Sequence, residues 1–209
     1  MKSISKYVPY LLLVAYVIEF IMLGITPLDR ATWWVENLTV LVVILILVGM
    51  YIKGIRFSNT AYILMFIFPF MHTIGGHYTF EKVPFDWFNH MFGYERNMYD
   101  RVAHATVGLY AFPLVEYLLS RKRVATAFWA YFTSLCFIVT VAAWYELFEW
   151  QYAIRSTMET GIAVLGAQGD IWDAQKDMLM DTLGAITALV FFTIHRAVYS
   201  DINTVESKK

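Results

Sequence analysis

The chain has 209 residues, of which 59% are hydrophobic, 18% aromatic and only 16% charged. Soluble domains carry about 25% charged residues, so this composition, with a mean hydropathy of +0.53, indicates a polytopic membrane protein. The net charge of −1 gives no indication of a nucleic-acid partner. The single Cys136 excludes an intrachain disulfide and a metal site built from cysteines. We expect one integral membrane domain over residues 1–209, since no polar linker divides the chain.

Six apolar segments predict an all-α fold, a bundle of six transmembrane helices, because a span needs about 20 mostly apolar residues. In chain order they are 8–26, 38–52, 60–76, 99–119, 126–152 and 173–197. No small-residue cleavage site follows the first segment, so we expect it to remain as a span. Residues 78–98 are rich in Phe, Tyr and Trp, which predicts an aromatic outer loop that lies in the interface or caps the bundle.

Basic residues predict the orientation of these spans. Of the 16 Lys and Arg, ten fall on the side of the two termini, and the short loops "KGIR" (53–56) and "SRKR" (120–123) concentrate them. The positive-inside rule therefore places both termini in the cytoplasm. Six of the seven Trp then lie near the outer interface, where amphipathic rings gather.

Ionisable residues gather at the outer ends of four predicted spans: His72, His77, Asp100, His104, Glu146, Glu149, Asp173, Asp177 and Asp181. A charge at the centre of a span costs roughly 2.5–3.5 kcal/mol, so these groups must face inward and find partners. Gly184 shares the aspartate face of the last span, and Gly108 continues the face of Asp100 and His104; both allow close helix approach. "GG" at 75–76 predicts a helix break that returns His77 toward the site.

The partner of these carboxylates is either a divalent cation or shared protons. His and carboxylate oxygens are ordinary ligands of Zn, Mn, Fe or Mg, so the candidate metal ligands are His72, His77, Asp100, His104, Glu146 and Asp177. Glu149 and Asp173 are candidate general bases, and Arg96 and Arg101 are candidate ligands of an anionic headgroup. In the simpler interpretation, Asp170 and Asp173 only complement the positive start of the last helix.

Four motifs in the chain resemble the signatures of the YjdF-type bacterial inner-membrane family: "HTIGGHYTF" (72–80), "RNMYDRVAH" (96–104), "WYELFEW" (144–150) and "GAQGDIWDAQKDM" (166–178). The resemblance covers nearly the whole chain and implies a multi-pass protein of the bacterial inner membrane. More distantly, His104, Glu146 and Asp177-x3-Asp181-x2-Gly184 are similar to VanZ-like proteins, which are linked to glycopeptide resistance. In those proteins the last motif often has Asn where this chain has Asp181.

Three functions remain open from the sequence. The first is a metal-dependent enzyme whose metal polarises a bond or activates water in a lipid-linked or envelope substrate. The second is a proton- or cation-coupled carrier, in which the same groups titrate in turn. The third is a non-catalytic scaffold with a structural metal. Membrane lipids are expected partners in all three, and a second copy of the chain is a further one.

Overall fold

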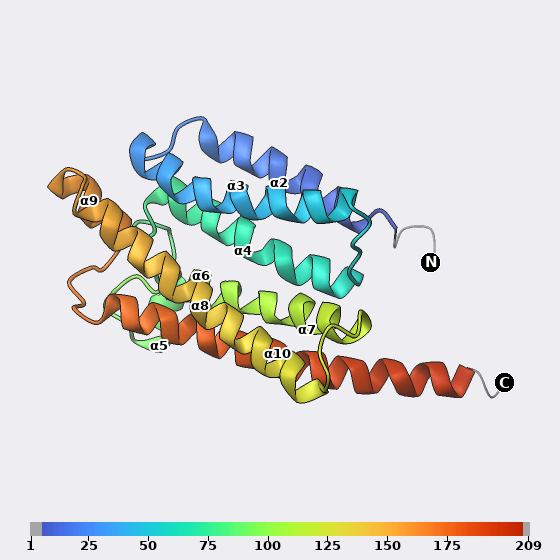
Figure 1. The fold of residues 1–209 in the computed structure, drawn as a ribbon. Coiled ribbons are helices and arrows are strands. Elements are labelled where there is room, and N and C mark those ends of the chain that lie inside the picture. The colour runs from blue at the N-terminus through green and yellow to red at the C-terminus, as the bar shows by residue number, and fades with distance from the viewer. Residues whose placement is uncertain (1–5, 207–209) are drawn as a thin grey trace.

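The computed structural model describes residues 6–206, with side chains as far as residue 198, and every regular element in that range is a helix (Figure 1). The helices are α2 (Val8–Gly24), α3 (Arg30–Ile52), α4 (Asn59–Tyr78), α5 (Asp86–Phe92), α6 (Tyr99–Val107), η1 (Gly108–Tyr110), α7 (Ala111–Ser120), α8 (Ala127–Ala153), α9 (Met158–Leu165) and α10 (Asp173–Glu206). The predicted all-α fold class is therefore confirmed.

Four of these helical segments are long and apolar enough to cross a membrane. They are α3, the continuous run Tyr99–Ser120 that joins α6, η1 and α7, then α8, and the Asp173–Val198 part of α10. Within the described residues, α2 is equally apolar but has only 17 residues. Four spans are enough to make the protein multi-pass.

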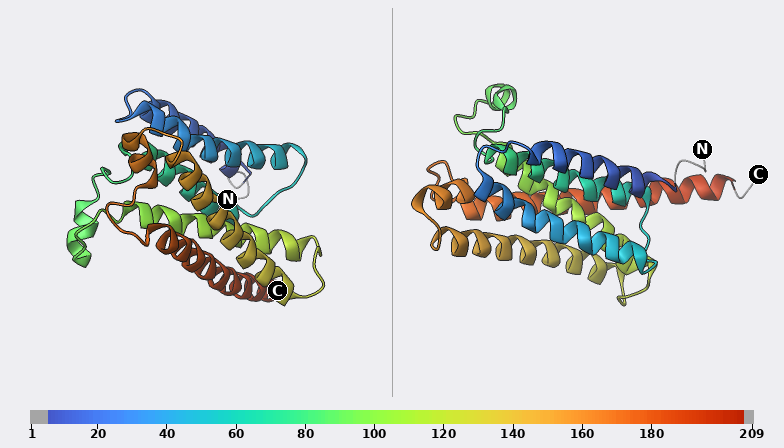
Figure 2. Two further views of the ribbon diagram at one scale, coloured as in Figure 1. Left: turned by 60° about the vertical axis from the view of Figure 1, so that its left-hand side comes forward. Right: turned by 90° about the horizontal axis from the view of Figure 1, so that it is seen from above.

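The helices form one bundle around two larger apolar cores and a smaller cluster of Phe80, Val83, Tyr99 and Ala103. α2 and α3 both pack on α4, while α8 and the α6–α7 run pack on α10. The first core joins α4, α7, α8 and α10, and the second joins α2, α3 and α4. The start of α2 and the C-terminal part of α10 lie at one end of the bundle, and α5 and α9 lie at the opposite end (Figures 1 and 2).

The second predicted span begins eight residues too late. α3 starts at Arg30 because Asp29 caps it: the backbone N–H of Thr32 donates to the Asp29 carboxylate at 2.6 Å. This bond keeps the pKa of Asp29 below its usual range. The earlier start places Glu36 and Asn37 inside the helix, where both are buried.

The predicted helix break at residues 75–76 is wrong, since α4 continues through both glycines to Tyr78. The glycines are needed for space. A Cβ on Gly75 would overlap the ring of Phe80, and one on Gly76 would lie 2.9 Å from the Asn37 side chain. The two glycines are therefore required for close packing and not for the backbone freedom of a turn.

Glycines also allow the most extensive helix contact of the fold, that between α6 and α10. A Cβ on Gly184 would overlap the backbone carbonyl of Ala105, and one on Gly108 would overlap the α10 backbone between Asp181 and Ala185. The predicted close approach at Gly184 is confirmed. It brings the aspartates of α10 against the polar face of α6.

We expect Gly184→Ala to destabilise the protein by about 1–3 kcal/mol, because the methyl group must push two backbones apart. Gly49→Ala in α3 is the matched control, since nothing lies within 4 Å of the Cβ it would add. Alanine has the higher helix propensity, so Gly49→Ala should leave stability unchanged or raise it slightly. Thermal unfolding in detergent compares the two, and equal melting temperatures would disprove the close contact.

Candidate metal and ion-pair site

Four aspartates form a file along the start of α10. Asp170 precedes the helix, and Asp173, Asp177 and Asp181 follow at successive turns of one face. Exposure falls along the last three from 8% to 3% to 1%. Each deeper carboxylate has lost more water and therefore depends more on a protein partner.

Arg101 of α6 is the main partner of this file. Its side chain is buried, its Nη2 lies 2.5 Å from Asp173 Oδ1, and its Nη1 pairs with Asp177. Its Nη1 also donates to the backbone carbonyl of Asp173. A buried guanidinium between two carboxylates explains how like charges are tolerated at adjacent helix turns.

Arg96 reaches the same file from the loop before α6. Its Nη1 donates to Asp173 Oδ1 at 2.8 Å and lies 3.5 Å from Asp170 Oδ2. Its Nε and Nη2 are buried without a hydrogen-bond partner in the described part of the chain. Of the two predicted headgroup ligands, Arg101 is committed to aspartates, whereas Arg96 retains donors for an anion.

Asp170 stabilises the approach to α10. Its Oδ1 accepts the backbone N–H of Trp172 at 3.0 Å, and its Oδ2 lies 2.6 Å from Lys176 Nζ. The Lys176 ammonium and the Trp172 N–H together hold the pKa of Asp170 below its usual range. This carboxylate is ionised at neutral pH; Lys176 on its own segment is its closest cation, and Arg96 and Arg101 lie further away at 3.5 Å and 3.4 Å.

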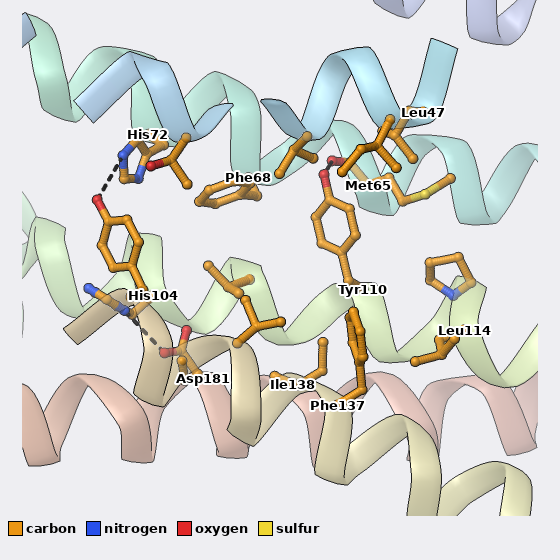
Figure 3. Close-up of a pocket in the computed structure, with 18 of the residues that line it drawn as sticks. Leu47, Met65, Phe68, His72, His104, Tyr110, Leu114, Phe137, Ile138 and Asp181 are labelled. Atoms are coloured by element: carbon orange, nitrogen blue, oxygen red, sulfur yellow. Dashed lines mark hydrogen bonds and ion pairs between the residues drawn. The ribbon is translucent and has the colours of Figure 1, made fainter. Parts of the chain in front are cut away.

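His104 holds the centre of the site and its two ring nitrogens have different surroundings. Nδ1 lies 3.2 Å from Asp181 Oδ2, as the dashed line in Figure 3 marks. Nε2 faces Asp100 Oδ1 at 3.7 Å and Asp177 Oδ1 at 3.9 Å. Asp100, His104 and Asp177 each offer one ligand atom within 4.8 Å of the others. When Asp181 accepts the Nδ1 proton, the Nε2 lone pair points at the two carboxylates.

Glu146 and Glu149 approach the site from α8. Glu149 is buried and Glu146 half-buried. Glu146 lies within electrostatic range of His104, Asp100 and Asp177, and its Oε1 is buried without a hydrogen-bond partner among the described residues. Asp181 Oδ1 is in the same condition. These buried oxygens are acceptors that a bound cation or a shared proton would satisfy.

The structure assigns the other two predicted ligands elsewhere. His72 Nε2 lies 3.1 Å from Glu36 Oε2, and the Tyr145 hydroxyl donates to the same oxygen at 2.8 Å. His77 Nδ1 contacts the backbone carbonyl of Leu23 at 2.7 Å and joins α4 to the end of α2. Because the helix does not break, the spacing of five positions from His72 to His77 keeps His77 on another face, about 140° away.

The buried Glu36 and the half-buried Tyr145 are two polar residues of this region that the sequence patterns do not reveal. Glu36 precedes the predicted span 38–52, although Asp29 is a recognisable capping residue that marks the earlier start of α3. Tyr145 precedes Glu146 in the "WYELFEW" motif and attracts no attention as one aromatic among many. Its ring lies 5.9 Å from His72 and 6.1 Å from His104, so it connects the two histidines.

A cavity of about 480 Å³ begins at these side chains and runs along the inside of the bundle (Figure 3). His72, His104, Tyr145 and Asp181 line one end. The rest of the lining is mostly aliphatic and aromatic side chains from α3, α4, η1, α7 and α8. We define this space as the central cavity.

Comparison with known proteins identifies a family of membrane proteins. Residues 8–197 match the family described as "Predicted membrane protein (DUF2238)". The chain is 32% identical over 176 residues to "Inner membrane protein YjdF" of Escherichia coli (strain K12), covering 80% of each chain. This protein therefore belongs to the DUF2238 family of membrane proteins. No solved structure is significantly similar to the chain.

Membership in the family confirms the resemblance to YjdF-type proteins, whereas the similarity to VanZ-like proteins stays a prediction. The relative's name and the four apolar helices together support a multi-pass inner-membrane protein.

We expect Arg101→Gln to destabilise the protein by about 3–5 kcal/mol, because it leaves buried carboxylates without their cation. Arg155→Gln is the matched control, since Arg155 lies just after α8, is exposed, and its side chain hydrogen-bonds only to Gln151 among the described residues; its cost should stay within about 0.5 kcal/mol. Thermal unfolding in detergent measures both. If the two variants melt together, Arg101 does not hold the aspartate file.

Proposed function

We propose that this protein spans the inner membrane six times, with both termini in the cytoplasm, and binds a divalent cation near the outer face. Six long helical segments of the described chain support this topology, one for each proposed span. They are α2, α3, α4, the α6–η1–α7 run, α8 and α10. The basic loops at 53–56 and 120–123 lie at the same end as the start of α2. Lys2, Lys208 and Lys209, which contribute to the charge count, lie outside the described residues.

The orientation of His104 is the observation that carries the metal proposal. A hydrogen bond from one ring nitrogen to a carboxylate, with the other nitrogen facing further carboxylates, is the usual arrangement of a metal-ligating histidine. Asp100, His104 and Asp177 supply three ligand atoms from two helices. Glu146 supplies an oxygen without a hydrogen bond from a third helix. One imidazole with carboxylates suits Zn, Mn or Fe better than Mg.

We further propose that the site acts on a lipid-linked or envelope substrate. The metal, when bound, would supply a Lewis acid that polarises a substrate bond. Arg96 would hold an anionic group through its unpartnered Nε and Nη2. Of the two candidate bases, Asp173 accepts from both Arg96 and Arg101, so Glu149 is the better general base.

The carrier is the second candidate function. The group Glu36–His72–Tyr145 favours it, because it extends the ionisable residues to α3 and α4. The mostly apolar lining of the central cavity opposes it, since a path for protons or cations across the membrane needs polar groups along its length. A scaffold with a structural metal would need no such cavity.

We expect the purified protein to bind a divalent metal, and Asp177→Asn to lower its occupancy by at least about tenfold, a ligand-scale loss. Asp170→Asn is the matched control on the same file and should retain the metal, because Asp170 pairs with Lys176 and caps Trp172. Elemental analysis and titration with Zn²⁺ or Mn²⁺ measure both variants. If Asp170→Asn alone lost the metal, the site would lie at a different turn of α10 from the one proposed. Absence of metal from every variant favours shared protons.

Topology has its own test. In a Cys136→Ser background, single cysteines at the exposed positions His90 and Lys122 report opposite ends of the bundle. We expect a membrane-impermeant maleimide added to intact cells from outside to label position 90 and to spare position 122. Labelling of position 122 alone would reverse the orientation, and labelling of both would refute the six-span topology.

A further inference from the structure

The central cavity is lined by both α3 and α8, and a gap separates the backbones of these two helices. α3 packs on α4, and α8 packs on α7 and α10, but α3 and α8 have at most sparse backbone contact with each other. Three lining residues beside this gap are exposed at the surface: Ile46 of α3 is 56% exposed, and Phe137 and Val141 of α8 are 53% and 39% exposed. Both helices are long and apolar enough to cross a membrane. An opening between them would therefore face lipid.

The lining separates one polar end from a long apolar part. On α3 the lining positions run from Thr39 to Met50, about 16 Å of helix. That length is about half the hydrocarbon core of a bilayer. Phe57, Pro113 and Tyr117 line the far end of the cavity. Tyr110 points into it but its hydroxyl donates to the Met65 carbonyl at 2.7 Å, so it offers little to a polar ligand.

We propose that the central cavity binds one hydrocarbon chain of a membrane lipid, which enters between α3 and α8, with its polar end at His104 and Asp181. Water does not fill a space with so few polar groups, whereas the bilayer supplies hydrocarbon at the opening. The volume, about 480 Å³, is that of an ordinary ligand pocket. This inference rests on the proposed function and narrows its substrate class, because it places an apolar chain beside the candidate metal ligands.

Photochemical labelling in vesicles tests the proposal on the whole protein. Phosphatidylcholine vesicles would carry either a phospholipid with a diazirine in its acyl chain or a polyprenyl phosphate with a diazirine in its isoprenoid chain. Ile138 is the internal reporter, because it lines the cavity and is only 1% exposed. Leu45 of α3, 68% exposed and outside the cavity lining, reports contact with bulk lipid.

We expect adducts on Ile138 as well as on Leu45 in the wild-type protein. Val43→Trp should lower labelling of Ile138 by about tenfold, since the indole occupies the space for the chain. Val42→Trp is the matched control: Val42 is its neighbour, is 48% exposed and does not line the cavity. Labelling of Leu45 should not change in either variant. Whichever probe labels Ile138 identifies the chain as acyl or isoprenoid.

Absence of adducts on Ile138 from both probes in the wild type would overturn the proposal, and so would equal labelling in the two tryptophan variants. The wild-type experiment tests the proposal by itself, so the conclusion does not depend on whether Val43→Trp folds. Asp177→Asn separates this inference from the metal site, because it should lose metal and keep the Ile138 adducts. Adducts without metal in the wild type would leave the cavity supported and refute the metal.

Discussion

The buried ion pairs of Arg101 are the constraint on which the rest of the site depends. Its guanidinium joins Asp173 and Asp177 on the neighbouring helix and is itself 3% exposed. Taking these charges out of water costs several kcal/mol per ion, which only close pairing offsets. α6 and α10 must therefore meet in one register and at one rotation. That register brings His104 to Asp181 and sets the Nε2 nitrogen between Asp100 and Asp177.

Close backbone packing makes this pairing geometrically accessible. Gly108 and Gly184 let the two helices touch at a depth just below the ion pairs, where any side chain would separate them. In a membrane, helix association depends on such van der Waals contact and on polar pairs, because lipid removes the hydrophobic difference between inside and outside. The glycines and the arginine thus support one another. The glycines bring the axes together, and the arginine specifies which faces meet.

Two groups of polar side chains lie close together inside the bundle, and Tyr145 contacts both of them. The first is built around His104 by α6 and α10, and the second joins Glu36 to His72 between α3 and α4. The Tyr145 hydroxyl donates to Glu36 while its ring lies against both imidazoles. The central cavity begins under this link. A cavity with one polar end and a long apolar part is the arrangement expected for an amphipathic ligand from the bilayer.

Sequence alone determined the helical class, the position of the ionisable residues near the ends of their helices and the need for close approach at Gly184, because hydropathy and spacing along a helix are local properties. Tertiary structure decided which way each helix is turned and what each charge meets. The sequence predicts Arg101 as a ligand of an anionic headgroup. In the structure it pairs instead with aspartates of α10, which lie over 70 residues away in the chain. His77 follows a glycine pair that suggests a turn, yet packing against Phe80 and Asn37 explains the glycines. Partners distant in sequence and the rotation of packed helices are non-local, so no pattern in one chain specifies them.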